Sequence, residues 1–204
     1  MSITIKSGAT SDEATVDPTS KAVRVTLYDT AGVAQSPRRT YRATTAVALV
    51  AANGTAPFIA VYGSATTVVR IKTIIISGYT LTAAEYIGTR VAKYSTAITG
   101  GTATALVQTP LDASDAAATL SICNSYTVAP TAGTKIGDVA ARRSLGQATV
   151  AVAAGIPNDI EIQFDQYDQE GLVLRGTAQG IGIYFAAAPA SAVTTAVMIE
   201  WSEE

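Results

Sequence analysis

The stretch Val-Val-Arg-Ile-Lys-Thr-Ile-Ile-Ile at residues 68–76 decides the class of fold. Its apolar and polar residues alternate with a period of two, which is typical of a β-strand with one face in the core. Arg70 and Lys72 fall on the wet face. The residues expected on the core face are Val69, Ile71, Thr73 and Ile75. We expect this strand to begin half exposed and to end buried.

The same alternation recurs along the chain. Residues 160–164 alternate, and so do residues 197–201, where Val197, Ile199 and Trp201 are expected to point inward. Short strands at such spacing predict an antiparallel sandwich or barrel, and the lack of long amphipathic helices between them argues against parallel βαβ units. One or two helical turns are expected at 111–118, with Asp112 as the cap. The other expected strands are 46–51, 58–62, 66–77, 85–99, 102–109, 118–126, 149–153, 172–174 and 181–185, and the strand that ends at Trp201 is expected to begin at Val193.

Glycine-rich segments mark the expected turns. Gly100-Gly101 predicts a hairpin between residues 94–99 and 102–107, because glycine reaches the positive φ that tight hairpin turns require. Residues 176–182 are also rich in glycine, but their spacing matches no phosphate-binding loop. We interpret them as a bend between two strands.

Residues 1–45 differ from the remainder, residues 46–204. They are richer in charges and turn formers, and only residues 22–28 show strand alternation. An isolated strand needs a sheet to pair with, because a lone hairpin is marginal in water. The sequence leaves two interpretations open: residues 1–45 form an attachment arm or small β subdomain, or their strand completes the main sheet.

Composition excludes several chemistries. The 204 residues contain no histidine, which removes His-activated nucleophiles, His-ligated metals and His proton shuttles. With a net charge of −2 and no long apolar run, neither nucleic acid nor a membrane is an expected partner, and no cofactor is expected. Cys123 is expected to be a buried small apolar residue. The 38 alanines and 29 threonines are expected to form close contacts between sheets or subunits.

The densest carboxylate cluster is Asp159, Glu161, Asp165, Asp168 and Glu170. Paired carboxylates can hydrolyse glycosidic bonds, and carboxylate oxygens can bind Ca²⁺. The loop at 165–171 lacks the ligand spacing and central glycine of an EF-hand, so calcium binding by Asp165, Asp168 and Glu170 stays open. A solvated hairpin loop is the simpler interpretation, and no catalytic, cofactor or metal residue is predicted.

Most of the chain resembles structural proteins of tailed-bacteriophage particles, including capsid decoration or cement proteins, head fibres and tail-fibre-like proteins. The segments that carry the resemblance are 58–71, 92–97, 100–102, 126–127, 130–133, 173–179 and 199–204, with 16–17 and 21–25 similar to attachment segments. The resemblance implies a jelly-roll β-sandwich, self-association as a trimer, and an N-terminal region that docks on the particle. It transfers no functional residue, because no motif here identifies one.

The leading hypothesis is therefore a non-enzymatic capsid decoration protein, made in the host cytoplasm and located on the virion surface. Its partners would be the major capsid protein or another virion protein, and further copies of itself. The alternative is a tail-fibre module that recognises a host glycan, with aromatic and acidic groups gathered near Tyr167 and Asp168. A third hypothesis is a glycanase that uses Asp165 and Glu170.

Overall fold

The computed structural model describes residues 15–16, 23–24, 38–49, 54–80, 87–145, 159–165, 171–190 and 193–204. The chain divides into two compact units, residues 1–37 and residues 38–204. In the first unit, β1 (Thr15–Val16) pairs antiparallel with β2 (Val23–Arg24). Within the described ranges, no helix has the length and apolarity needed to cross a membrane.

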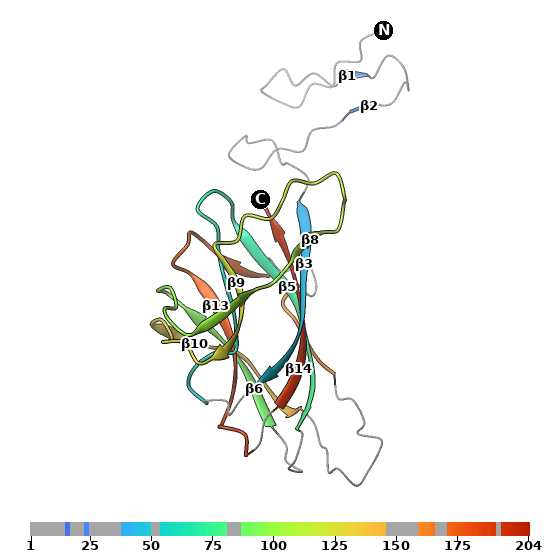
Figure 1. The fold of residues 1–204 in the computed structure, drawn as a ribbon. Helices are drawn as coiled ribbons and strands as arrows, with labels where there is room; N and C mark the ends of the chain where they lie inside the picture. The colour runs from blue at the N-terminus through green and yellow to red at the C-terminus, as the bar shows by residue number, and fades with distance from the viewer. Residues whose placement is uncertain are drawn as a thin grey trace. The chain divides into compact units, whose positions relative to one another are not determined.

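The larger unit is built from two antiparallel sheets (Figure 1). The first has the order β10-β6-β13-β4-β9-β7, and the second has the order β11-β5-β14-β3-β8, with β12 also paired to β5. The strands of the first sheet are β4 (Ile59–Tyr62), β6 (Ile87–Tyr94), β7 (Thr102–Ala105), β9 (Ile122–Val128), β10 (Lys135–Leu145) and β13 (Gly180–Phe185). Those of the second are β3 (Arg39–Leu49), β5 (Val69–Thr80), β8 (Gln108–Pro110), β11 (Ile160–Gln163), β12 (Leu172–Leu174) and β14 (Val193–Glu203).

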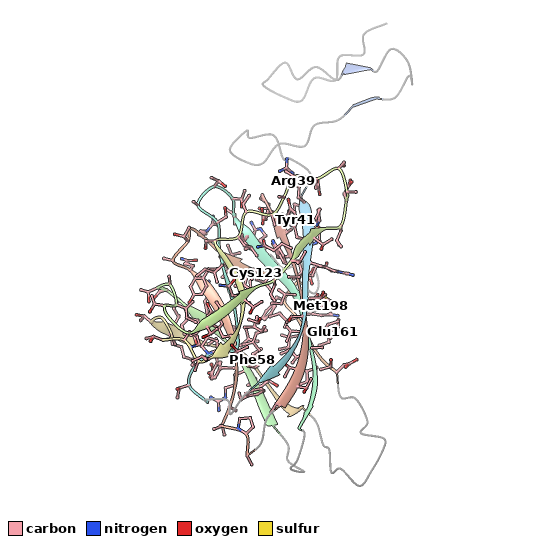
Figure 2. The ribbon with its side chains drawn as sticks, in the orientation of Figure 1. Arg39, Tyr41, Phe58, Cys123, Glu161 and Met198 are labelled. Atoms are coloured by element: carbon pink, nitrogen blue, oxygen red, sulfur yellow. The ribbon has the colours of Figure 1, made fainter. Side chains whose placement is uncertain are left out.

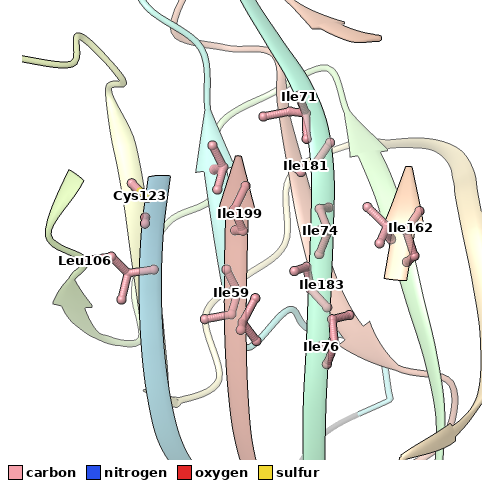
Figure 3. Close-up of a cluster of buried hydrophobic side chains, with 14 of the residues drawn as sticks. Ile59, Ile71, Ile74, Ile76, Leu106, Cys123, Ile162, Ile181, Ile183 and Ile199 are labelled. Atoms are coloured by element: carbon pink, nitrogen blue, oxygen red, sulfur yellow. The ribbon is translucent and has the colours of Figure 1, made fainter. Parts of the chain in front are cut away.

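The main core lies between the two sheets, so the prediction of an all-β antiparallel fold is confirmed and the arrangement is that of a β-sandwich. Figure 3 shows isoleucines of both sheets meeting in this core. The rings of Tyr41 and Trp201 stack at 5.7 Å, and those of Phe58 and Phe185 at 4.6 Å. Cys123 is buried as predicted (Figure 2), and burial raises the pKa of its thiol to about 12.

The predicted core face of β5 is correct for its first half and wrong for its second. Val69 and Ile71 are fully buried, but so is Ile74, whereas Ile75 is half-buried. The register explains the change: β14 places Trp201 opposite Ile71 and Glu200 opposite Thr73, so Lys72 is an extra residue. Such a β-bulge reverses the face that each later residue occupies.

Two other local predictions are wrong. Residues 111–118 form turns and no helix; the backbone N–H and the hydroxyl of Ser114 both donate to Asp112 Oδ1, at 2.9 and 2.6 Å. Gly100 and Gly101 do take positive φ, yet the segments on either side do not pair with each other. Thr99 bridges to Thr131, and β7 pairs with β9. The predicted strand at 149–153 lies outside the described residues.

Strand β10 was not predicted from the sequence, because its alternation is interrupted. Its register against β6 shifts three times, which leaves Ile136, Val139 and Ser144 as extra residues. Ile136 is 61% exposed and Val139 is 39% exposed. Three bulges within eleven residues leave no period of two for a sequence pattern to detect.

The boundary expected at residue 45 falls inside β3, which begins at Arg39. Here β3 pairs with β14 along its full length, and Tyr41 and Ala43 are buried in the main core.

We predict that a chain starting at Arg38 unfolds within about 2 °C of the full chain. Removing residues 1–45 should lower the free energy of unfolding by at least about 3 kcal/mol, because core side chains are lost. Thermal unfolding followed by circular dichroism compares the two truncations. Equal stability of both would contradict the assignment of β3 to the core.

Candidate functional site

A second apolar cluster covers the outer face of the first sheet. It contains four buried tyrosines, and its members are Ala60, Tyr62, Ala92, Tyr94, Ile98, Tyr126 and Tyr184. Strands β4 and β13 are therefore buried on both faces, and every residue in them is buried. Burial raises the pKa of Tyr62 and of Tyr94, because it disfavours the charged phenolate.

Two glycines of β13 make room for the tyrosine rings. A Cβ on Gly180 would lie 2.4 Å from the ring of Tyr62, and one on Gly182 would lie 2.9 Å from the ring of Tyr94. The rings thus lie directly over the glycine backbone, an arrangement that compensates for the missing side chains.

We predict that Gly180→Ala destabilises the protein by about 1–3 kcal/mol, because the new methyl group collides with the Tyr62 ring. Gly137→Ala in β10 is the matched control: its Cβ would meet nothing within 4 Å, and we expect a change of less than about 1 kcal/mol, toward higher stability. Urea unfolding measures both. A Gly180→Ala protein as stable as the control would show that the ring moves aside freely.

A polar network closes the cluster at β10. Lys135 Nζ donates to the Tyr184 hydroxyl, which in turn donates to Asp138. Asp138 also pairs with Lys135 at 2.6 Å and with Arg90 at 3.2 Å. Burial opposes the charged form of Asp138, but the hydrogen bonds from Lys135 and Tyr184 and the charge of Lys135 outweigh it, so the pKa of this carboxyl is lowered. The hydrogen bond to Asp138 is also the main cause of the raised pKa of Lys135. These contacts link Lys135 and Asp138 of β10 to Arg90 of β6 and to Tyr184 of β13.

A lowered folded-state pKa means that Asp138 stabilises the fold above its ordinary pKa of 3.8, and that this contribution is lost as pH falls below it. We predict that Asp138→Asn is less stable than the wild type at pH 7 by less than about 1 kcal/mol, since the site is partly exposed. The difference should vanish as pH falls through the lowered pKa. Urea unfolding at a series of pH values tests this, and a difference independent of pH would contradict it.

Two loops seal the tyrosine cluster from outside. Residues 95–101 and 129–134 are joined by the Thr99–Thr131 bridge and by a hydrogen bond of 2.9 Å from Ser95 N–H to the Thr134 carbonyl. The Tyr62 hydroxyl donates to the Thr96 carbonyl at 3.2 Å, which ties the buried ring to the loop. The loops and the tyrosines therefore form one packed layer.

The surface that continues from these loops carries no charge. Residues 94–111 and 116–134 contain no Asp, Glu, Lys or Arg, and the fold pairs the two stretches through β7 and β9. All four residues of β7 are exposed. The large apolar side chains beside it are also exposed: Val107 by 79%, Val128 by 57% and Leu111 by 50%. We call the exposed residues of 95–111 and 127–134 the uncharged edge.

The uncharged edge is the most distinctive surface in the described part of the chain. Solvent-exposed surface normally carries charges, and their depletion is the compositional mark of contact surfaces. The Ala and Thr excess predicts close contacts between sheets or subunits but does not place them. What marks this surface in the sequence is a long stretch that lacks charge and also lacks the apolar alternation of a buried strand.

The predicted carboxylate cluster is only partly described. Asp159, Glu161 and Asp165 are exposed, and Gln163 Nε2 donates to Glu161 at 2.5 Å. The positions of Asp168 and Glu170 lie outside the described residues, as does that of Tyr167. Within the described ranges, no group of three or more Cys, Asp and Glu residues could hold a metal ion. Residues 176–178 of the glycine-rich segment form the predicted bend between β12 and β13, whereas residues 180–182 belong to β13 itself.

The N-terminal arginines of the larger unit are paired within that unit. Arg38 contacts Glu204, Arg39 lies 3.8 Å from Asp115, and Arg42 lies 2.7 Å from Glu200. Because each cation has a carboxylate beside it, they do not form a free basic patch for an acidic partner.

Searches against protein-family models, curated proteins and solved structures find no match for this chain.

Proposed function

We propose that the chain is a non-enzymatic structural protein of a bacteriophage particle, which decorates or cements the capsid by packing against neighbouring subunits. The uncharged edge carries this proposal. It exposes Val107, Val128 and Leu111 together with a row of Thr and Ala side chains, and it holds no charged residue. A surface of this composition gains by packing against another protein, because burying it removes apolar area from water and leaves no charge unpaired.

The division of the chain supports the same function. Residues 1–37 form a unit of their own, and the larger unit begins at Arg38. We propose that residues 1–37 attach the protein to the major capsid protein, and that the sandwich is of jelly-roll type. Many identical contacts between neighbouring sandwiches strengthen a shell through multivalency.

No observation favours the glycan-binding alternative. It depends on Tyr167 and Asp168, which lie outside the described residues. Among the tyrosine side chains that the structure describes, those at 41, 62, 94, 126 and 184 are buried, as is Trp201, so these rings cannot stack on a sugar.

The proposal is tested by adding purified protein to phage capsids. The full chain should cosediment with capsids and add density to their surface in electron cryomicroscopy. The chain starting at Arg38 should stay folded but no longer sediment with them, since residues 1–37 supply the attachment. Density on the tail alone, or no binding by the full chain, would contradict a capsid decoration function.

A further inference from the structure

Strand β7 leaves one side of its backbone without a neighbouring strand in the described part of the chain. It pairs with β9 only, at the end of the first sheet. The segment then crosses to the second sheet, where β8 pairs only with β3 (Figure 1). Such an open edge is a template for a further strand.

The hydrogen bonds show which groups point outward. The Leu106 N–H donates to the Cys123 carbonyl at 2.8 Å, so the backbone groups of Leu106 point toward β9. In an antiparallel pair this direction alternates, so those of Thr104 also point toward β9. The N–H and C=O groups of Ala103 and Ala105 therefore point away from the sheet, and both side chains are small enough for close approach.

The two ends of this sheet differ in how they treat an incoming strand. At the β10 end, three bulges disturb the register, and Lys135 and Asp138 place charges there. Bulges and charges are the devices that natural sheets use against edge pairing. Strand β7 has neither a charge nor an extra residue of its own, since the shift in its pairing falls between Tyr126 and Val128 of β9.

We propose that the uncharged edge joins two copies of this chain across a two-fold axis, with the two β7 strands antiparallel. The partner of the uncharged edge is thus a second copy of this chain. The contact rests on the proposed function only for its biological setting on a phage particle. An identical copy fits because an isologous contact sets each patch against itself, and a surface with no charge meets no like charge there. The register that uses both outward residues sets Ala103 opposite Ala105 of the other copy and Thr104 opposite its own counterpart.

The contact closes at two copies. Each chain uses the same edge, so the two edges satisfy each other and no further copy can add there. A trimer would need the uncharged edge to meet a different surface of the next copy, and the bulged β10 end does not offer a straight strand. Val107 and Val128 would lie beside the paired strands and lose their exposure to water.

Sedimentation equilibrium of the full chain, at concentrations up to about 1 mM, tests the contact. We expect a dimer for the wild type. For Thr104→Lys we expect a dimer dissociation constant at least about tenfold higher, because two like charges then face each other at the axis. Ile136→Lys is the matched control, since it puts the same charge on an exposed apolar residue at the β10 end, and it should dimerise like the wild type. Circular dichroism checks that both variants are folded.

Mixing provides a second measurement. Thr104→Lys and Thr104→Glu chains should each be weakened alone and should form a mixed dimer when combined, because opposite charges then meet at the axis. A wild-type monomer at all concentrations, a trimer, equal weakening by Ile136→Lys, or no mixed dimer would each overturn the two-fold contact. Capsid cosedimentation is scored separately: a monomer that still binds capsids overturns this contact alone, and a dimer that fails to bind them overturns the capsid function alone.

Discussion

The pairing of the last strand with both of its neighbours is the constraint on which the sandwich depends. Strand β14 lies in the middle of the second sheet and pairs along its length with β3 on one side and β5 on the other. Its Trp201 stacks on Tyr41, and its buried Glu203 accepts hydrogen bonds from the Trp201 indole and from the backbone and hydroxyl of Thr119. This carboxylate ties the loop after β8 to the sheet. Because β3 and β14 are far apart in sequence, the second sheet closes only after the whole chain is available, which is a slow topology to fold.

Strands β4 and β13 in the middle of the first sheet are buried on both faces because loops cover them, and this has consequences for the surface. A sheet with cores on both sides needs a cover of low polarity, and residues 95–101 and 129–134 supply it. The same uncharged composition continues onto β7, the end strand of the sheet, which lies beyond the tyrosine cluster that the loops cover. The uncharged edge is thus an extension of an interior-like surface into solvent, which is the physical reason why we propose it as a contact between proteins.

Other surfaces of the larger unit differ from the uncharged edge, because they carry paired charges. Arg42 and Glu200 pair on the outer face of the second sheet, where Figure 2 also labels Met198 and Glu161. At β10, Asp138 pairs with both Lys135 and Arg90. Ion pairs of this exposed kind contribute little stability, but they keep these faces soluble and unsuited to self-pairing. The sandwich thus has faces with paired charges and, within the described residues, one edge that exposes apolar side chains without any charge.

The sequence by itself determined the class of fold and most of the strands, because a period of two survives wherever one face of a strand is wet, as in residues 160–163 and 193–201. It also determined that Cys123 is buried and that no histidine chemistry is available. Only the tertiary structure decided which strands pair, where the phase of β5 reverses at Lys72, and that β10 exists, since bulges are set by the neighbouring strand. The uncharged edge was also decided by the tertiary structure. Its two stretches are visible in the sequence, but that they meet and stay exposed depends on long-range pairing of β7 with β9, which local patterns do not encode.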